Sequence, residues 1–264
     1  DITPKRGKYA PRETESEAQS TFSDAVTVMN ESSGWYCQHM KDGTRPPLPP
    51  EMSYITEHGG YYIGEDEKVI YLTFDAGYEN GNVEKILDTL KQENVPGAFF
   101  ILDNLAKTNT DLVKRMVDEG HTVCNHTAKH KDMTKMTSKE DFAAELRAME
   151  DVYRDKIGGE IARYYRPPEG KFNEQNLAWA DELGYKTIFW SFAYADWDNA
   201  NQMSREKAVE KIITNTHNGE VILLHPTSKT NAEILPELIA KWREMGFTFG
   251  TLDELTGQKG GNNE

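Results

Sequence analysis

The sequence contains few cysteines and no long hydrophobic run. Only two cysteines occur among its 264 residues, Cys37 and Cys124, which excludes a disulfide framework and a thiolate metal cluster. The longest nearly apolar stretches, such as residues 97–102 and 221–224, are far shorter than the roughly 18 residues that a membrane-spanning helix needs. We therefore expect no transmembrane segment in this chain.

Positive charge is also scarce. Lysine and arginine number 30 against 44 aspartates and glutamates, which gives a net charge of −14 and excludes nucleic-acid binding through a broad basic face. A Gly-x-Ser-x-Gly elbow, a Ser-His-Asp order and a glycine-rich phosphate loop are all missing. The sequence thus gives no support to a serine hydrolase or a phosphate-binding loop.

The first quarter of the chain differs in composition from the rest. Residues 1–33 are rich in Glu, Ser, Thr and Lys around a short apolar cluster, which predicts a flexible tether with at most a weak helix; the cluster is Phe22, Val26 and Met29. The chain begins at Asp1, so we expect a processed mature form or a truncated chain. Residues 34–67 are dense in proline, which predicts an extended arm without helix, packed on a larger body. Residues 257–264 are typical of a frayed tail.

From residue 68 to 256, strand patterns alternate with helical patterns. The predicted strands are 69–74, 98–102, 122–125, 164–166, 187–192, 221–224 and 247–252. Apolar residues recur every three or four positions in two clear helices, one from Phe142 to Ile157 and one from Leu235 to Trp242. Ser204 is a candidate N-cap, and Gly120, Gly184 and Gly246 are candidate C-caps. Strict alternation with about seven strands predicts an α/β fold in which parallel strands form a closed or nearly closed barrel with helices outside.

Reactive residues follow five of the predicted strands. The segments are TFDAGYEN at 73–80, NHTAKH at 125–130, RPPEG at 166–170, ADW at 195–197 and LLHP at 223–226. In a parallel barrel the carboxyl ends of the strands meet at one rim, where active sites form. The rim would therefore gather six reactive side chains: Asp75, His126, His130, Arg166, Asp196 and His225.

Each of these residues has a simpler explanation when it is taken alone. Asp75 could only cap a helix, the two histidines could be surface residues, and Arg166 could belong to a structural ion pair. Asp196 could be a turn residue, whereas His225 ends a buried strand and must find a polar partner. Together the simpler explanations require five independent coincidences.

The set meets the chemical demands of metal-assisted hydrolysis. His126 and His130 would turn toward one cation if the segment after the strand made a helical turn, because residues four apart share a helix face. The cation would polarise a carbonyl and acidify its bound water, and Asp75 would take the proton of that water. Arg166 would keep Asp75 ionised. His225 would protonate the leaving group, held and tuned by Asp196.

The five ordered segments resemble the motifs of the carbohydrate esterase family 4 polysaccharide deacetylases, the NodB homology domain, over about residues 68–255. The resemblance implies a distorted (β/α) barrel and hydrolysis of acetyl groups on a sugar polymer, with Zn²⁺ or another divalent ion. By position, Asp75 matches the catalytic base, Arg166 its partner, His126 and His130 the metal ligands, Asp196 the tuning residue and His225 the acid. Leu223 matches the residue lining the acetyl-methyl pocket, and Glu169 the backbone N–H donor to the oxyanion. Trp197 and Lys171 complete the predicted substrate-binding set.

One position departs from the family pattern. Most members carry a second aspartate directly after the base, as a third metal ligand, where this chain has Ala76. The site would keep two imidazoles with water or a neighbour such as Asn80, so the resemblance implies a weakly held metal. The form TFDxGYEN, preceded by Gly34 and Trp35, is similar to the N-acetylmuramic acid deacetylases that lead to muramic δ-lactam in spore cortex, in which the second aspartate is also replaced.

Three hypotheses follow. The first is a peptidoglycan N-acetylmuramic acid deacetylase acting outside the cytoplasm, in the cell wall or the forespore intermembrane space, on strands without stem peptides. The second is an N-acetylglucosamine deacetylase of peptidoglycan or chitin, or an acetyl-xylan esterase. The third is a sugar-binding protein without turnover. We expect a monomer whose partner is the glycan strand. Acetate release separates the first two hypotheses from the third, and the deacetylated sugar separates the first from the second.

Overall fold

A computed structural model describes residues 30–257 of the chain. The predicted tether cluster at Phe22, Val26 and Met29 and the tail after Gly257 lie outside the described residues. Within residues 30–257, no helix is both long and apolar enough to cross a membrane.

The centre of the fold is a curled sheet of nine strands whose pairings are all parallel. The strands are β2 (Gly60–Tyr61), β3 (Val69–Ala76), β4 (Ala98–Ile101), β5 (Thr122–Asn125), β6 (Ala162–Tyr165), β8 (Lys186–Ile188), β9 (Phe192–Ala193), β10 (Glu220–Leu224) and β11 (Thr248–Phe249). Their order is β2-β8-β6-β5-β4-β3-β10-β9, with β11 paired to β3. The predicted distorted barrel of parallel strands is confirmed.

The segment between the two ends of the sheet explains the distortion. β8 pairs with β6 near one end of the strand order, and β9, only a few residues later, pairs with β10 at the other end. The linking residues stay bonded to both sides, because Phe189 N donates to Tyr61 O at 2.7 Å and Ser191 N donates to Val221 O at 2.8 Å. The prediction of one strand over 187–192 is therefore wrong, since this segment must leave one neighbour to join another.

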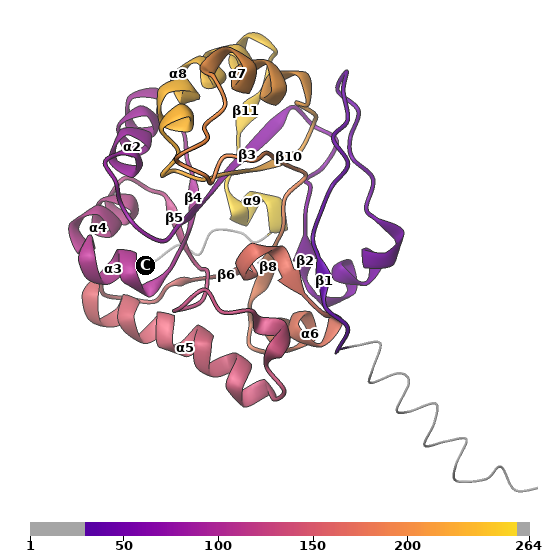
Figure 1. Cartoon of the computed structure of the whole chain (residues 1–264), viewed down its shortest axis with the longest axis vertical. Coiled ribbons are helices and arrows are strands. Elements are labelled where there is room, and N and C mark those ends of the chain that lie inside the picture. The colour runs from indigo at the N-terminus through magenta and orange to yellow at the C-terminus, as the bar shows by residue number, and fades with distance from the viewer. Residues whose placement is uncertain (1–29, 258–264) are drawn as a thin grey trace, which may run out of the picture.

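Most of the helices surround the sheet, whereas α9 lies within the ring that they form in the view of Figure 1. They are α2 (Asn82–Glu93), α3 (Asp103–Thr108), α4 (Thr110–Asp118), α5 (Lys139–Lys156), α6 (Glu174–Glu182), α7 (Arg205–Thr214), α8 (Lys229–Glu244) and α9 (Leu252–Thr256), with short 3-10 helices η2 (Met133–Lys135) and η3 (Pro168–Gly170). Ser204 caps α7 as predicted, and the three predicted C-terminal glycines all have positive φ. The predicted strand 247–252 is wrong in its second half, because Thr251 builds a capping box that starts α9.

The alternation of side chains along β3 decides which residues reach the barrel interior. Leu72, Phe74 and Ala76 belong to the buried cluster shared with the surrounding helices, whereas Tyr71 packs in the cluster inside the barrel. Because successive side chains of a strand point to opposite faces, Asp75 shares the inner face with Tyr71. The methyl group of Ala76 faces the helices instead.

The N-terminal arm is not wholly extended. A nine-residue 3-10 helix, η1 (Pro50–His58), begins at a proline, which is tolerated at a first helical position because its missing N–H has no partner there. The prediction of an arm without helix is therefore wrong. β1 (Ser33–Gly34), at the end of the predicted tether, pairs with β7 (Lys171–Phe172). The division at residues 67 and 68 stays a prediction, and Gly64 N crosses it to donate to Gly219 O at 2.8 Å.

The loop after β3 is fixed by one carboxylate. Glu79 Oε1 accepts from the backbone N–H groups of Asn80, Gly81 and Val83 at 2.7, 2.8 and 3.0 Å, and its Oε2 accepts from Glu84 N at 2.9 Å. These donors include N–H groups of the first turn of α2, which have no partner within the helix. Glu79 therefore caps α2 and holds the loop that follows Asp75 and the end of β3.

We predict that Glu79→Ala lowers the free energy of unfolding by about 1–2 kcal/mol, because loss of a side-chain cap costs about that much. Urea unfolding followed by circular dichroism measures the change. Lys85→Ala, an exposed position on the same helix, is the matched control. Equal midpoints for Glu79→Ala and the parent would contradict the capping role.

Candidate active site

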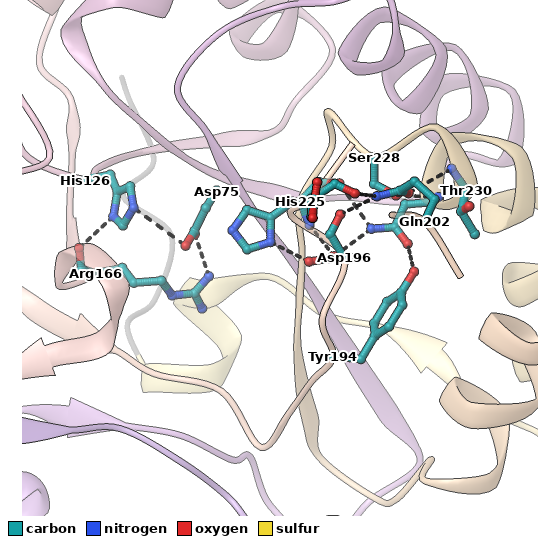
Figure 2. Close-up of polar contacts among 11 residues, drawn as sticks. Asp75, His126, Arg166, Tyr194, Asp196, Gln202, His225, Ser228 and Thr230 are labelled. Atoms are coloured by element: carbon teal, nitrogen blue, oxygen red, sulfur yellow. Dashed lines mark hydrogen bonds and ion pairs between the residues drawn. The ribbon is translucent and has the colours of Figure 1, made fainter. Parts of the chain in front are cut away.

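The residues predicted from five strand ends do gather at one rim of the barrel. A cleft of about 560 Å³ opens there, lined by Asp75, His130, Glu169, Gly170, Trp190, Ala193, Tyr194, Trp197, Leu223 and His225. His126, Arg166 and Asp196 are almost fully buried. Figure 2 shows two groups, with His126 and Arg166 around Asp75 on one side and Asp196 behind His225 on the other.

Asp75 is held by a buried guanidinium. Arg166 Nη1 donates to Asp75 Oδ1 at 3.0 Å, while the Nε and Nη2 of Arg166 donate to the carbonyls of Ile188 and Phe189 at 2.8 and 3.0 Å. Burial raises the pKa of Asp75, but the nearby His126, Arg166 and His225, with the hydrogen bond from Arg166, outweigh burial and lower this pKa below its ordinary value. Asp75 is therefore an ionised acceptor at neutral pH.

His126 presents one fixed nitrogen toward Asp75. Its Nδ1 lies 2.7 Å from the carbonyl oxygen of Arg166 and must carry the proton to donate there, which leaves Nε2 with a free lone pair 3.6 Å from Asp75 Oδ2. Burial, with the neighbouring charges of His130 and Arg166, lowers the pKa of His126 to about 4. The ring is therefore neutral at neutral pH, as a metal ligand must be.

The rings of His126 and His130 lie close together, although the segment between them is not helical. The segment 126–130 has no helical turn, and Thr127 and His130 both have positive φ, at 71° and 56°. The side chain of Asn125 accepts from Thr127 N at 2.9 Å, and the Thr127 hydroxyl accepts from His130 N at 3.0 Å. These bonds fold the segment into a tight turn, so the predicted helical turn is wrong. The two rings nevertheless lie with centroids 5.1 Å apart.

The residues around the histidine pair fit a divalent ion only in part. Two imidazoles supply two of the usual four zinc ligands, and Ala76 supplies none. In residues 30–257, no group of three or more His, Cys, Asp or Glu side chains is arranged to hold a metal ion. The suggested neighbour Asn80 is engaged elsewhere, because its Nδ2 donates to Thr227 O at 2.9 Å and its Oδ1 accepts from Asn82 N at 3.2 Å. The suggestion of Asn80 as a ligand is not supported.

His225 is bonded to Asp196 twice. His225 Nδ1 lies 2.7 Å from Asp196 Oδ1, and His225 N donates to Asp196 Oδ2 at 2.8 Å. Burial opposes the charged imidazolium, but the hydrogen bond and charge of Asp196, with a smaller effect of Asp75, raise the pKa of His225 above its ordinary value. The second nitrogen of the ring, Nε2, is left for the cleft.

Three polar residues that sequence reasoning missed support this pair. Asn231 Nδ2 donates to Asp196 Oδ2 at 2.7 Å and to His225 O at 3.1 Å, and its Oδ1 accepts from the hydroxyl of Tyr194. Gln202 Nε2 donates to Asp196 O at 2.8 Å. None of the three lies in a motif that signals chemistry, because Asn231 follows the N-cap of α8 and the others lie in a loop.

The predicted substrate-binding residues form the cleft wall. Leu223, Trp197 and Glu169 line the cleft, and Lys171 pairs with Glu169 at 3.0 Å beside it. Glu169 has a left-handed backbone with φ of 57°, a conformation that costs energy in a non-glycine residue. The rings of Trp197 and His225 are arranged edge to face, with their centroids 6.4 Å apart.

Comparison with known proteins identifies the family. A family model described as polysaccharide deacetylase matches residues 63–188. An uncharacterized 30.6 kDa protein of Geobacillus stearothermophilus is 41% identical, over 89% of each chain. The peptidoglycan-N-acetylmuramic acid deacetylase PdaA of Bacillus subtilis is 39% identical over 89% of this chain and 90% of its own. The solved structure of PdaA, described as a family 4 carbohydrate esterase, matches with a TM-score of 0.83 at 37% identity, over 87% of this chain and 98% of its own.

The chain belongs to the family 4 carbohydrate esterases, the polysaccharide deacetylases. The resemblance found in the five sequence motifs is thereby confirmed, and so is the assignment of the chain to the hydrolases. In this deacetylase one cleft is lined by Asp75, whose carboxyl pKa is lowered, and by His225, whose imidazole pKa is raised. Such a pair of opposite shifts is typical of a base and an acid that work together.

Asp196→Asn is expected to move the alkaline limb of the pH–rate profile to lower pH and to reduce the rate. The charge of Asp196 helps to raise the pKa of His225, and an acid works only below its pKa, so loss of that charge narrows the active range from the alkaline side. Acetate release measured across pH tests this. Asp198→Asn, an exposed neighbour, is the control, and a profile that Asp196→Asn leaves unmoved would reduce Asp196 to a turn residue.

Proposed function

We propose that this polysaccharide deacetylase removes the N-acetyl group of N-acetylmuramic acid in peptide-free peptidoglycan strands, as a step toward the muramic δ-lactam of spore cortex. The observation that carries the hydrolytic part is the pair of oppositely tuned groups, Asp75 and His225, on one cleft with Leu223. Similarity to PdaA along most of both chains supports the sugar. A peptidoglycan substrate implies action outside the cytoplasm.

Asp75 and His225 divide the proton transfers of amide hydrolysis. The ionised Asp75 takes a proton from the attacking water, and Arg166 keeps that carboxylate charged and oriented. The imidazolium of His225 gives its proton to the departing sugar nitrogen, so the carbon–nitrogen bond breaks to acetate and a free amine. Asp196 stabilises the imidazolium and fixes the orientation of its ring.

His126 and His130 are the proposed holders of a divalent ion, most simply Zn²⁺. Such an ion would polarise the acetyl carbonyl and acidify the attacking water. The neutral His126 ring with its free Nε2 suits this task. The backbone N–H of Glu169 is the proposed donor to the oxyanion, and Leu223 the proposed contact of the acetyl methyl.

The substrate preference depends on a carboxylate beside the acetyl group. Muramic acid carries a lactyl carboxylate, which the negative charge of Glu169 would repel. Lys171 lies 3.0 Å from Glu169 and offsets that charge at the cleft wall. A stem peptide converts the lactyl acid to an amide and blocks its ring closure with the freed amine, so the peptide-free strand is the proposed substrate.

Two other functions remain as alternatives. A deacetylase of N-acetylglucosamine in peptidoglycan or chitin, or an acetyl-xylan esterase, would use the same base and acid on a different sugar. A sugar-binding protein without turnover would need neither pKa shift. The paired shifts of Asp75 and His225 favour turnover.

Metal binding gives one test of the ligand assignment. His126→Ala and His130→Ala are expected to lose Zn²⁺ in equilibrium dialysis followed by metal analysis, and Asp75→Asn is expected to keep most of the ion. Acetate release by Asp75→Asn should fall ~10²–10⁴-fold, the usual contribution of a general base. His58→Ala, whose ring is bonded to Glu174 and does not line the cleft, is the control. If His126→Ala and His130→Ala both bound as much Zn²⁺ as the parent, the assignment of the two ligands would be refuted.

The sugar is tested with defined strands. Peptide-free strands are expected to lose acetyl at muramic acid and to yield the δ-lactam by mass, whereas strands with stem peptides should give no lactam. Lys171→Glu should weaken this reaction several-fold and leave Zn²⁺ content unchanged, because it reverses the charge beside Glu169. Lys186→Glu, which breaks the similar pair with Asp181, is the control. If only glucosamine lost its acetyl group, the protein would be an N-acetylglucosamine deacetylase and not an N-acetylmuramic acid deacetylase.

A further inference from the structure

Two aromatic side chains at the catalytic rim remain exposed. Of the large hydrophobic side chains among residues 30–257, only five are well exposed; these are Tyr36, Tyr78, Val117, Trp197 and Met245. Trp197 is 63% exposed and Tyr78 46%. Both follow strands that end at the cleft, Tyr78 three residues after Asp75 and Trp197 directly after Asp196. Ligand-binding clefts are lined predominantly by hydrophobic and aromatic side chains, so exposed rings at this rim are candidate ligand contacts.

Tyr78 is exposed and yet held in place. Its hydroxyl accepts from Asn199 Nδ2 at 2.9 Å, and its backbone lies directly before Glu79, whose carboxylate is bonded to four N–H groups. The loop that carries Asn199 is fixed as well, because Gln202 Nε2 donates to the carbonyls of Asp196 and Asp198 at 2.8 and 2.9 Å. A ring oriented before binding loses little entropy when a ligand packs on it.

The two rings have different positions relative to the cleft. Trp197 lines it together with Asp75 and His225, whereas Tyr78 is not among the lining residues. The hydrogen bond from Asn199 nevertheless ties Tyr78 to the loop that carries Trp197. Tyr78 therefore lies beyond the reacting position, at the rim on the side of the Asp196–Asn199 loop. A polymer whose acetyl group occupies the cleft extends beyond the reacting sugar, so a neighbouring sugar on this side of the rim would meet Tyr78.

We propose that Tyr78 is a stacking platform for the pyranose unit next to the one being deacetylated. A pyranose presents a face of C–H groups, which packs on an aromatic face through dispersion and loss of apolar hydration. The proposal rests on the polymeric glycan of the proposed function, and it does not depend on which sugar loses its acetyl group.

Affinity for strands of increasing length tests the platform. Peptide-free glycan oligosaccharides of two, four and eight sugars are titrated by calorimetry into Asp75→Asn, whose turnover is expected to be ~10²–10⁴-fold below that of the parent, with and without a second change. Tyr78→Ala is expected to raise the Kd of the eight-sugar strand about 5–10-fold and that of the shortest about twofold or less, because a short ligand binds mainly in the cleft. One aromatic contact of about 1 kcal/mol corresponds to this range.

Two further variants separate stacking from other roles of Tyr78. Tyr78→Phe keeps the ring and loses the bond from Asn199, so its Kd should stay within about twofold of the parent. Met245→Ala removes an exposed side chain next to the carbonyl that accepts from Lys68 Nζ, at the end of the barrel where β3 begins, and should change nothing. The platform would be overturned if Tyr78→Phe lost as much affinity as Tyr78→Ala. It would also be overturned if Tyr78→Ala lost the same affinity for strands of every length, or lost no affinity for any strand.

The same measurements keep this proposal distinct from the proposed function. If strands bind with the expected dependence on length but glucosamine loses its acetyl group, the platform stands and the muramic acid assignment fails. If no glycan strand binds to Asp75→Asn or to the parent, both proposals fail.

Discussion

The buried guanidinium of Arg166 joins the chemistry of this protein to the closure of its barrel. Its Nη1 holds Asp75, and its other nitrogens donate to the carbonyls of Ile188 and Phe189, in the segment that leaves one end of the sheet for the other. The backbone carbonyl oxygen of Arg166 accepts from Nδ1 of His126, which leaves Nε2 of that ring as the nitrogen with a free lone pair. Its guanidinium carbon also lies 4.3 Å from the centroid of the Phe100 ring, inside the barrel. A fully buried cation is tolerated because each of these contacts replaces water.

The protonation states of the rim follow from this arrangement. His126 and Arg166 favour the ionised form of Asp75, burial favours the neutral form of His126, and Asp196 favours the charged form of His225, so the pKa values of three neighbouring groups are moved in directions that suit three tasks. Asp196 can act in this way because Asn231 and the backbone of His225 satisfy its second oxygen.

Much of the fold and of the candidate site could be predicted from the sequence, because the alternating order of strands and helices is enough to indicate a parallel barrel. The side chains at strand ends then follow, since parallel strands deliver their carboxyl ends to one rim. The failures share a cause, which is hydrogen bonding, by side chains in one case and by the backbone in the other, that periodicity does not report. Asn125 and Thr127 fold the histidine segment into a turn, and the residues between β8 and β9 change partners within a few positions. Asn231 was missed because its partners lie far away in sequence.

The N-terminal arm bears on the cleft for a related reason. β1 pairs with β7, Trp35 N donates to Gly170 O at 2.8 Å, and the Trp35 indole donates to Trp190 O at 2.8 Å. Gly170 and Trp190 both line the cleft, and a Cβ on Gly170 would lie 2.9 Å from the Trp190 ring, so only glycine fits there. The wall that carries Glu169 is thus set by contacts from outside the barrel. The arm supports the binding cleft from outside, because Trp35 bonds the backbone of Gly170, directly after the strained Glu169, and the backbone of Trp190.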